Sequence, residues 1–226
     1  KYLLTSGSTG QPKVVINTHR MLCANQQQIA QVWPFLNRHR LVLLEWLPWS
    51  HTFGANHNFH MALAHGGSLA IDEGRPVPGL IDKTVANLRE VRPNFYFNVP
   101  RGFDMLLPFL EHDADFAASF FDRLEGIFYA GAALPQSLWE RIVAVASRVR
   151  DSPLWFTSAW GSTETSPAVT MNHPGAHRVG TVGRPVRGVR VEVDRSRVED
   201  PSGEGELVVH GPNVMLGYRN KPEATA

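Results

Sequence analysis

Short apolar runs alternate with helical periodicity along the first part of the chain. The strand-like runs cover residues 2–5, 13–17, 40–46, 68–72, 94–98, 126–130 and 154–160. Between several of them, as in 81–91 and 134–149, apolar residues recur every three or four positions, which is the spacing of an amphipathic helix. Strands separated by such helices favour a mostly parallel sheet flanked by helices, with ligands bound in loops at the carboxyl ends of the strands.

The pattern changes after about residue 165. Residues 188–196 and 203–211 alternate apolar and polar positions and are bracketed by Gly, Pro and Asp, which is typical of antiparallel strands joined by turns. We therefore expect an α/β segment over residues 1–175 and a β-rich unit over 176–226. Because the chain starts inside a strand and stops without a closing element, we also expect it to be part of a longer protein.

Composition narrows the class of function. The 226 residues carry a net charge of +1 with scattered Lys and Arg, which disfavours a nucleic-acid partner.

Cys23 is the single cysteine, so an internal disulfide is excluded and a reducing, cytoplasmic compartment is the default expectation. Its place in an expected helix after Thr18 predicts a packing role. No apolar stretch is long enough to predict a membrane span.

The stretch LLTSGSTGQPKVV, residues 3–15, puts a small polar loop between two strand-like runs. Gly7 and Gly10 allow close approach of a ligand to the backbone, which suits a polyphosphate. The loop differs from a P-loop, since Lys13 follows Gly10 by three residues and Val14 stands where Ser or Thr is required. A Ser/Gly-rich surface turn explains the loop alone equally well. The hydroxyl donors of this loop are Thr5, Ser6, Ser8 and Thr9, and its cation is Lys13.

This loop resembles the phosphate-loop signature of the adenylate-forming superfamily, which comprises acyl-CoA synthetases, luciferases and peptide-synthetase adenylation domains. Further stretches match in the same order: YAGAALP (129–135), WGSTETSP (160–167), GRPVRGVRVEV (183–193) and GEGELVVHGPNVMLGY (203–218). The resemblance implies a large-domain α/β fragment followed by a small antiparallel, barrel-like subdomain. It also implies that an upstream part and a mobile C-terminal domain lie outside this chain.

The resemblance implies a role for each matching residue. Lys13, His51, Thr163 and Glu164 would be catalytic, with Glu164 holding Mg²⁺. The ATP-binding set would be Thr5, Ser6, Gly7, Ser8, Thr9, Gly10, Lys13, Gly131, Ala132, Ala133, Trp160, Gly161, Ser162 and Thr163.

The acid is expected near the stretch EWLPWSHTFGANHNFHMALAHGG, residues 45–67, which is dense in aromatics and histidine. A zinc site made by His51, His57 and His60 is disfavoured, because no cysteine or carboxylate companion lies nearby. WLPWSHTFG and GGSLAIDEGRP resemble the feruloyl-CoA synthetase branch, which implies a hydroxycinnamate such as ferulate. The residues expected to border the acid are His51, Phe53, Ala130, Gly131 and Ala159.

The resulting hypothesis is an ATP-dependent acid–thiol ligase. It would form an acyl-adenylate and then a thioester with coenzyme A, using ATP and Mg²⁺. Two alternatives stay open: an adenylation domain that loads a carrier-protein thiol, and a non-catalytic nucleotide-binding relative. The sequence does not specify the oligomeric state.

Overall fold

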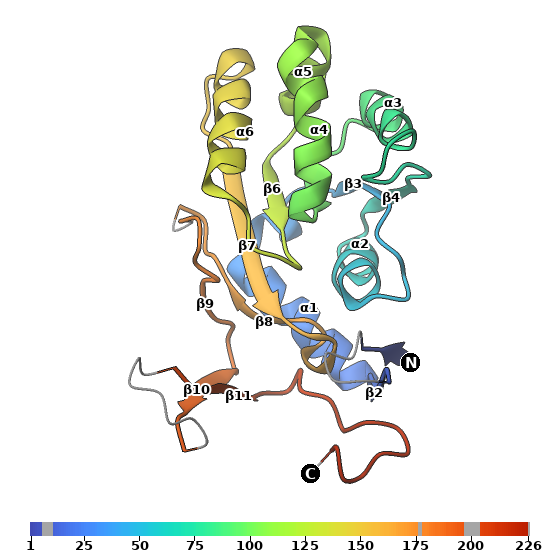
Figure 1. The fold of residues 1–226 in the computed structure, drawn as a ribbon, viewed down its shortest axis with the longest axis vertical. Helices are drawn as coiled ribbons and strands as arrows, with labels where there is room; N and C mark the ends of the chain where they lie inside the picture. The colour runs from blue at the N-terminus through green and yellow to red at the C-terminus, as the bar shows by residue number, and fades with distance from the viewer. Residues whose placement is uncertain (6–10, 176–177, 197–203, 226) are drawn as a thin grey trace.

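The computed structural model describes residues 1–5, 11–175, 178–196 and 204–225 (Figure 1). The α-helices are α1 (His19–Val32), α2 (His60–Ala64), α3 (Ile81–Val91), α4 (Pro100–His112), α5 (Ala114–Asp122) and α6 (Gln136–Val149). Shorter helical segments are η1 (Pro34–Asn37), the π-helix η2 (Phe53–Phe59) and η3 (Thr163–Thr165). The strands are β1 (Tyr2–Leu4), β2 (Val14–Ile16), β3 (Val42–Glu45), β4 (Ser68–Ile71), β5 (Phe95–Asn98), β6 (Gly126–Tyr129), β7 (Trp155–Gly161), β8 (Ala168–Met171), β9 (Arg184–Pro185), β10 (Arg190–Asp194) and β11 (Glu206–His210).

The central sheet has the strand order β5-β6-β7-β8-β9. β5, β6 and β7 are parallel, whereas β8 and β9 are added antiparallel at one side. The parallel connections run through α4 and α5 and then through α6, because a parallel crossover needs a dozen or more residues. β3 and β4 form a separate parallel pair, and β1 and β2 an antiparallel hairpin. The α/β prediction is confirmed, but the sheets are small and mixed.

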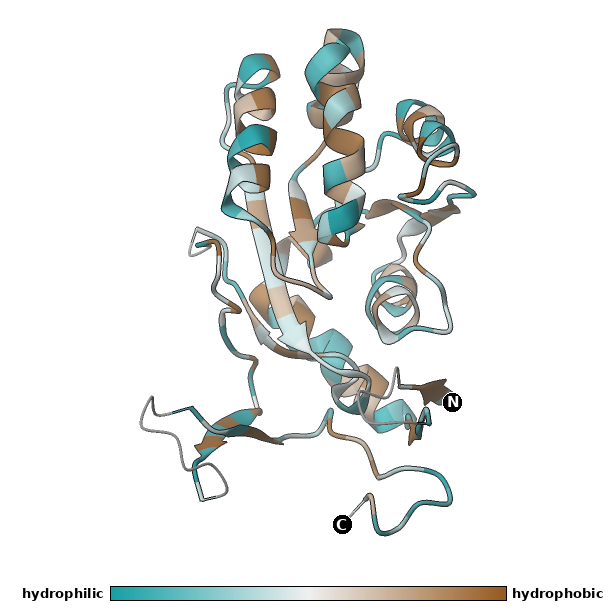
Figure 2. Ribbon diagram, viewed as in Figure 1, coloured by the Kyte–Doolittle hydropathy of each residue, from teal (hydrophilic) through white to brown (hydrophobic). Residues whose placement is uncertain are grey.

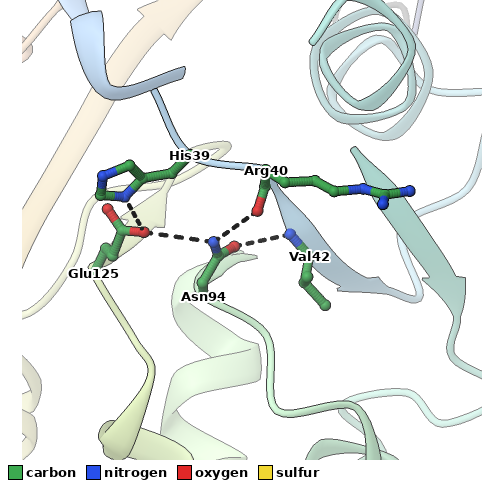
Figure 3. A network of polar contacts seen from close by, with 5 residues as sticks. All are labelled: His39, Arg40, Val42, Asn94 and Glu125. Atoms are coloured by element: carbon green, nitrogen blue, oxygen red, sulfur yellow. Dashed lines mark hydrogen bonds and ion pairs between the residues drawn. The ribbon is translucent and has the colours of Figure 1, made fainter. Parts of the chain in front are cut away.

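Asn94 connects the β3–β4 pair to the central sheet (Figure 3). Its side-chain Oδ1 accepts from the Val42 N–H at 2.8 Å, and its Nδ2 donates to the Arg40 carbonyl at 3.0 Å. The same Nδ2 lies 3.4 Å from Glu125 Oε1, which is also 2.8 Å from His39 Nδ1. One amide therefore joins the start of β3 to the chain entering β5 and β6.

Alternate residues of β5 enter two different cores. Tyr96 packs in a cluster with the apolar faces of α3, α4, α5 and α6, while Phe95 and Phe97 pack in a second cluster around Trp33, with α1, α2 and η2. Apolar and polar residues share these helices, as Figure 2 shows for α4, α5 and α6. A strand covered on both faces is apolar along its whole length, which explains the run NFYFN at 94–98.

The C-terminal residues do not form the expected barrel. In the described part of the chain, β10 and β11 form a two-stranded antiparallel ribbon and no closed barrel. Val193 and Leu207 of this ribbon are about half exposed, at 47% and 51%, so one apolar side is left without a packing partner among the described residues. A ribbon of two strands cannot close on itself, and closure needs further strands. The ribbon lies apart from the helical layers (Figure 1).

The boundary at residue 176 stays a prediction. Segments beyond it contact the α/β part: Val186 is buried in the second cluster, and the Thr181 carbonyl accepts a hydrogen bond from Ser158 Oγ at 3.3 Å. The backbone of Gly217 and Arg219 bonds to β2 on both sides of a Val15–Tyr218 bridge. The final described segment is therefore attached to the N-terminal hairpin.

Two further expectations concern exposure and membrane crossing. Cys23 is exposed on α1, so the expected packing role is wrong: the helix turns Met21, Asn25 and Ile29 inward and leaves position 23 on the outer side. Within the described ranges, none of the helices has both the length and the apolar character needed to cross a membrane.

Candidate active site

A cavity of about 410 Å³ lies where β6 and β7 end. Its walls come from segments far apart in sequence, which are 51–57, 128–134, 158–168 and 180–182. The carboxyl ends of parallel strands are the expected location of a ligand in an open α/β sheet. The sequence-predicted residues that line this cavity are His51, Phe53, Ala130, Gly131, Ala132, Ala133, Ala159, Trp160 and Gly161.

His51 stands at the entrance to η2 with one ring nitrogen engaged. The Phe53 N–H donates to His51 Nδ1 at 3.2 Å. Burial lowers the pKa of His51, which favours the neutral ring. In a neutral imidazole whose Nδ1 accepts, the proton sits on Nε2. His51 therefore offers an N–H donor that suits a carboxylate or a phosphate oxygen.

The turn after β6 supplies backbone and small side chains. Gly131 has φ +87°, a left-handed conformation that glycine adopts without strain. A Cβ at this position would meet only Val99 Cγ1, at 3.6 Å, so conformation rather than space requires the glycine. Ala130, Ala132 and Ala133 flank it on the cavity wall. This part of the cavity wall therefore carries only small side chains.

The end of β7 is shaped by a close approach to the following strand. A Cβ at Gly161 would lie 1.7 Å from the Pro167 carbonyl oxygen, so only glycine fits there. The chain then turns through η3, where the Ser162 N–H donates to Thr165 Oγ1 at 2.9 Å. Thr163 is buried in η3. Ser162, Thr163 and Glu164 thus continue directly from the cavity wall formed by Ala159 and Trp160.

Buried asparagines hold the segment that follows Glu164. Asn213 Nδ2 donates to the carbonyls of Thr165 and Ala168, at 2.8 and 3.0 Å. Asn25 exchanges two bonds with Ala168, one in each direction, at 2.8 and 3.1 Å. The turn that carries Glu164 is therefore fixed from α1 and from the segment after β11.

Glu164 and Lys13 approach the same aromatic ring. The Tyr218 hydroxyl donates to Glu164 Oε1 at 2.7 Å, and Lys13 Nζ lies 4.5 Å from the centre of the Tyr218 ring. Burial, followed by the neighbouring Glu164, raises the pKa of Tyr218 to about 12. The structure thus brings together two predicted residues that are some 150 positions apart in sequence.

Thr5 and Lys13 close the base of the predicted phosphate loop. The Thr5 N–H donates to the Lys13 carbonyl at 2.9 Å, and the Lys13 N–H donates to Thr5 Oγ1 at 3.2 Å. The remaining predicted loop residues, Ser6, Gly7, Ser8, Thr9 and Gly10, lie outside the described residues.

Comparison with protein families covers almost the entire chain. The sequence model for AMP-binding enzymes matches residues 2–219. This chain belongs to the AMP-binding enzyme family. The superfamily identified from the loop, the turn after β6 and the Trp160–Pro167 block is thereby confirmed.

Curated relatives of this AMP-binding chain differ in the acid that they are named for. A long-chain-fatty-acid–CoA ligase of Escherichia coli O6:H1 is 30% identical over 98% of this chain and 38% of its own length. A feruloyl-CoA synthase of Amycolatopsis is 28% identical over 99% of this chain and 43% of its own length. A probable non-canonical nonribosomal peptide synthetase, CymA of Salinispora arenicola, is 32% identical over 99% of this chain and 3% of its own length.

A solved structure shares the fold. A malonyl-CoA ligase, in a ternary product complex with methylmalonyl-CoA and AMP, superimposes with a TM-score of 0.79 at 27% identity, covering 99% of this chain and 46% of that one. The chain thus spans less than half the length of these ligases. Their names do not select one acid for this chain.

The sequence analysis assigns Mg²⁺ to one carboxylate, that of Glu164. Within the described residues, no group of three or more His, Cys, Asp and Glu side chains is placed to hold a metal ion by itself. Mg²⁺ bound with a nucleotide commonly takes only one or two protein carboxylates, because phosphate oxygens and water complete its octahedron. Glu164, half-buried beside Lys13 and Tyr218, fits that requirement.

Tyr218 and His57 are among the residues of this site that sequence reasoning missed. Tyr218 was present in a quoted family block, but nothing in the sequence indicated that its ring lies between Lys13 and Glu164. His57 was considered only as a zinc ligand, although it lines the cavity beside Phe53. The density of histidine and aromatic residues in 45–67 was the available signal for His57.

Proposed function

We propose that the protein containing this chain is an AMP-forming acid–thiol ligase of the acyl-CoA synthetase type. It would activate a carboxylic acid with ATP to an acyl-adenylate and then transfer the acyl group to coenzyme A. The observation that carries the proposal is one cavity with two sets of lining residues: His51, Phe53 and Ala130, expected on the acid side, and Ala132, Ala133 and Trp160, expected on the nucleotide side. Family membership of the chain supports the same chemistry.

The first half-reaction needs positioning and charge stabilisation more than a covalent catalyst. A carboxylate oxygen attacks the α-phosphorus of ATP, the bond to the bridging oxygen breaks, and pyrophosphate leaves. We assign the Lys13 ammonium to the phosphate chain and the neutral His51 Nε2–H to the acid or the phosphorus oxygens. Mg²⁺, held by Glu164, would neutralise charge on the pyrophosphate group. Such preorganised charges act most strongly where water is excluded.

The acid is proposed to be aromatic, a hydroxycinnamate such as ferulate. Support comes from the lining of the cavity: the Phe53 and Phe128 rings lie 5.6 Å apart at 63°, and small residues cover the turn after β6. An aromatic acid can pack its ring against such apolar rings in an offset-stacked or edge-to-face arrangement. The resemblance of two stretches to the feruloyl-CoA synthetase branch points in the same direction.

A second candidate is an adenylation domain that delivers the acyl group to a carrier-protein thiol. Such a domain would carry out the same first half-reaction. The 32% identity with the peptide synthetase CymA supports this second candidate. The two candidates differ in the acceptor, which this chain does not identify.

The test is ATP–pyrophosphate exchange by the full-length protein with separate panels of hydroxycinnamates, fatty acids and amino acids, followed by acceptor assays with coenzyme A and a carrier protein. Exchange with hydroxycinnamates and transfer to coenzyme A would support the proposal. Exchange with amino acids and transfer to the carrier would support the second candidate. Absence of exchange with every acid, in a protein that is folded, would contradict both.

A further inference from the structure

Residues 213–219, which we call the strap, join two parts of the candidate site. One end of the strap holds the turn η3, which carries Glu164. The Asn213 side-chain Nδ2 donates to the Thr165 carbonyl, and the Met215 N–H donates to the Glu164 carbonyl, both at 2.8 Å. The backbone of Glu164 is therefore bonded directly to the strap.

The other end of the strap pairs with β2, the strand that begins directly after Lys13. The Ile16 N–H donates to the Gly217 carbonyl at 3.2 Å, and the Arg219 N–H donates to the Val14 carbonyl at 2.9 Å. Backbone hydrogen bonds of this kind hold one extended segment in register with another. The strap therefore links the segment that carries the predicted phosphate lysine to the segment that carries the predicted metal carboxylate.

Tyr218 lies in the strap, and its side chain reaches both charged groups. The residue is half-buried, and its hydroxyl lies 2.7 Å from Glu164 Oε1. An ionised carboxylate can only accept, so the hydroxyl is the donor. Lys13 Nζ lies 4.5 Å from the centre of the Tyr218 ring, within the range of a cation–π contact. The hydroxyl and the ring thus make two separate contacts, one with an anion and one with a cation.

The hydroxyl contact determines how the carboxylate is presented. Because Oε1 accepts from Tyr218, the orientation of the Glu164 carboxylate is fixed and Oε2 is left as the oxygen for a cation. A group that hydrogen-bonds a metal-ligating side chain orients it, and its loss commonly weakens metal affinity by about 10–100-fold. Tyr218 can do this rigidly, because the residues on both sides of it are bonded to β2.

We propose that Tyr218 is a positioning residue of the nucleotide site, whose hydroxyl orients Glu164 for Mg²⁺ and whose ring places the Lys13 ammonium for the phosphates. This inference rests on the proposed function, because it presumes that Lys13 and Glu164 meet ATP and its metal. It adds that the strap sets the positions of the two charges before the nucleotide arrives. Charges held in place in advance need no reorganisation when the reaction occurs.

The first test measures ATP binding to the full-length protein by isothermal titration calorimetry, with excess Mg²⁺ and with EDTA. The quantity compared is the factor by which Mg²⁺ tightens ATP binding. Tyr218→Phe keeps the ring and removes the hydroxyl, so this factor should fall about tenfold while the affinity for metal-free ATP stays the same. A residue with a merely structural role would weaken both affinities together. An unchanged factor in Tyr218→Phe would overturn the role of the hydroxyl.

The second test concerns the ring. Tyr218→Leu also removes the aromatic face below Lys13, so metal-free ATP should bind about 2–5-fold more weakly than to Tyr218→Phe, the range for an exposed cation–π contact. Equal affinities of the two variants for metal-free ATP would overturn the role of the ring. Tyr2→Phe is the matched control, because Tyr2 is exposed on β1 with its ring 4.7 Å from the Arg219 guanidinium carbon. Both affinities should be unchanged in Tyr2→Phe.

This proposal and the ligase proposal fail differently, because the binding measurements need no acid. Exchange that proceeds normally, with an unchanged Mg²⁺ factor in Tyr218→Phe, removes the role of Tyr218 and leaves the ligase standing. A reduced factor without exchange for any acid removes the ligase and supports the role of Tyr218. ATP binding that does not depend on Mg²⁺ in the unsubstituted protein overturns the present inference. If Tyr218→Leu does not fold, Tyr218→Phe still decides the role of the hydroxyl.

Discussion

The hydroxyl of Tyr218 donates a 2.7 Å hydrogen bond to the carboxylate of Glu164. Lys13 Nζ lies 4.5 Å from the centre of the same tyrosine ring, so one side chain contacts both an anion and a cation from two distant segments. A cation over an aromatic face is attracted by the ring quadrupole, and a hydroxyl bonded to a carboxylate is a charge-assisted contact. Tyr218 thereby fixes the relative position of the two groups that we assign to the phosphates and to Mg²⁺.

Glu164→Gln is expected to weaken Mg²⁺-dependent adenylation by about 10²–10³-fold in rate while leaving the fold intact. The amide retains a hydrogen-bond acceptor for Tyr218 but loses the charge that a hard divalent cation requires. Pyrophosphate exchange at a series of Mg²⁺ concentrations measures the effect. Glu140→Gln, on the exposed side of α6, is the control. Unchanged Mg²⁺ dependence in Glu164→Gln would remove Glu164 from the mechanism.

Asn213→Ala tests the bonds that hold the Glu164 turn. The side chain is fully buried and donates to the Thr165 and Ala168 carbonyls; among the described side chains, Asn25 is a second donor to the Ala168 carbonyl. Leaving the Thr165 carbonyl unpaired is expected to lower the free energy of unfolding by about 1–3 kcal/mol. Urea unfolding measures the loss.

The matched substitution is Asn37→Ala, at an exposed position in η1, which is expected to change stability by less than about 0.5 kcal/mol. Because the Glu164 turn loses support, Asn213→Ala should also need more Mg²⁺ for half-maximal exchange. Equal stability of the two alanine variants would contradict the structural role of Asn213.

Ala130→Leu tests the cavity wall after β6. The added atoms enter the space proposed for the acid, and overfilling a packed site costs about 1–3 kcal/mol, or roughly 10–100-fold in kcat/KM for a ring-bearing acid. The KM for ATP should change much less, since Ala130 is assigned to the acid side. Ala144→Leu, on the exposed side of α6, provides the same substitution away from the cavity. An Ala130→Leu enzyme that uses hydroxycinnamates as well as the unsubstituted one would refute the location of the acid.

Glu45 is expected to make stability fall as the pH rises. Its side chain is buried at the end of β3. Burial raises the pKa of Glu45 to about 8 and outweighs a hydrogen bond from the Asn58 amide, which lowers the pKa. A carboxyl whose pKa is higher in the folded than in the unfolded state binds more protons when folded. Its contribution is complete below pH 4.5 and is lost as the pH rises through 8.

Glu45→Gln removes this titration and keeps the shape of the protonated group. The variant should match the unsubstituted protein near pH 5 and exceed its stability at pH 9, as measured by urea unfolding at each pH. Glu90→Gln, exposed on α3, should leave the pH profile unchanged. A Glu45→Gln profile parallel to that of the unsubstituted protein from pH 5 to 9 would show that Glu45 is already ionised when folded.

Sequence periodicity predicted the helical layers well where one face is apolar. α3 covers residues 81–91 as expected, and α6 begins two residues after the expected start at 134, because Leu134 and Pro135 still belong to the turn after β6. The antiparallel addition of β8 and β9 was not predicted. All four residues of β8 are buried, and such a pattern does not distinguish a parallel from an antiparallel neighbour. The antiparallel direction of β8 relative to β7 depends instead on the tight connection through η3.

Residue identity alone indicated the family, a mostly parallel sheet flanked by helices, and several of the cavity residues, such as Gly131 and Gly161. These follow from short-range constraints: apolar spacing, positive φ and close approach of neighbouring backbone. Only the tertiary structure decided that Tyr218 contacts both Lys13 and Glu164, and that His57 lines the cavity. Such relationships depend on which distant segments meet and on how each ring is turned, and no local pattern in the chain encodes either.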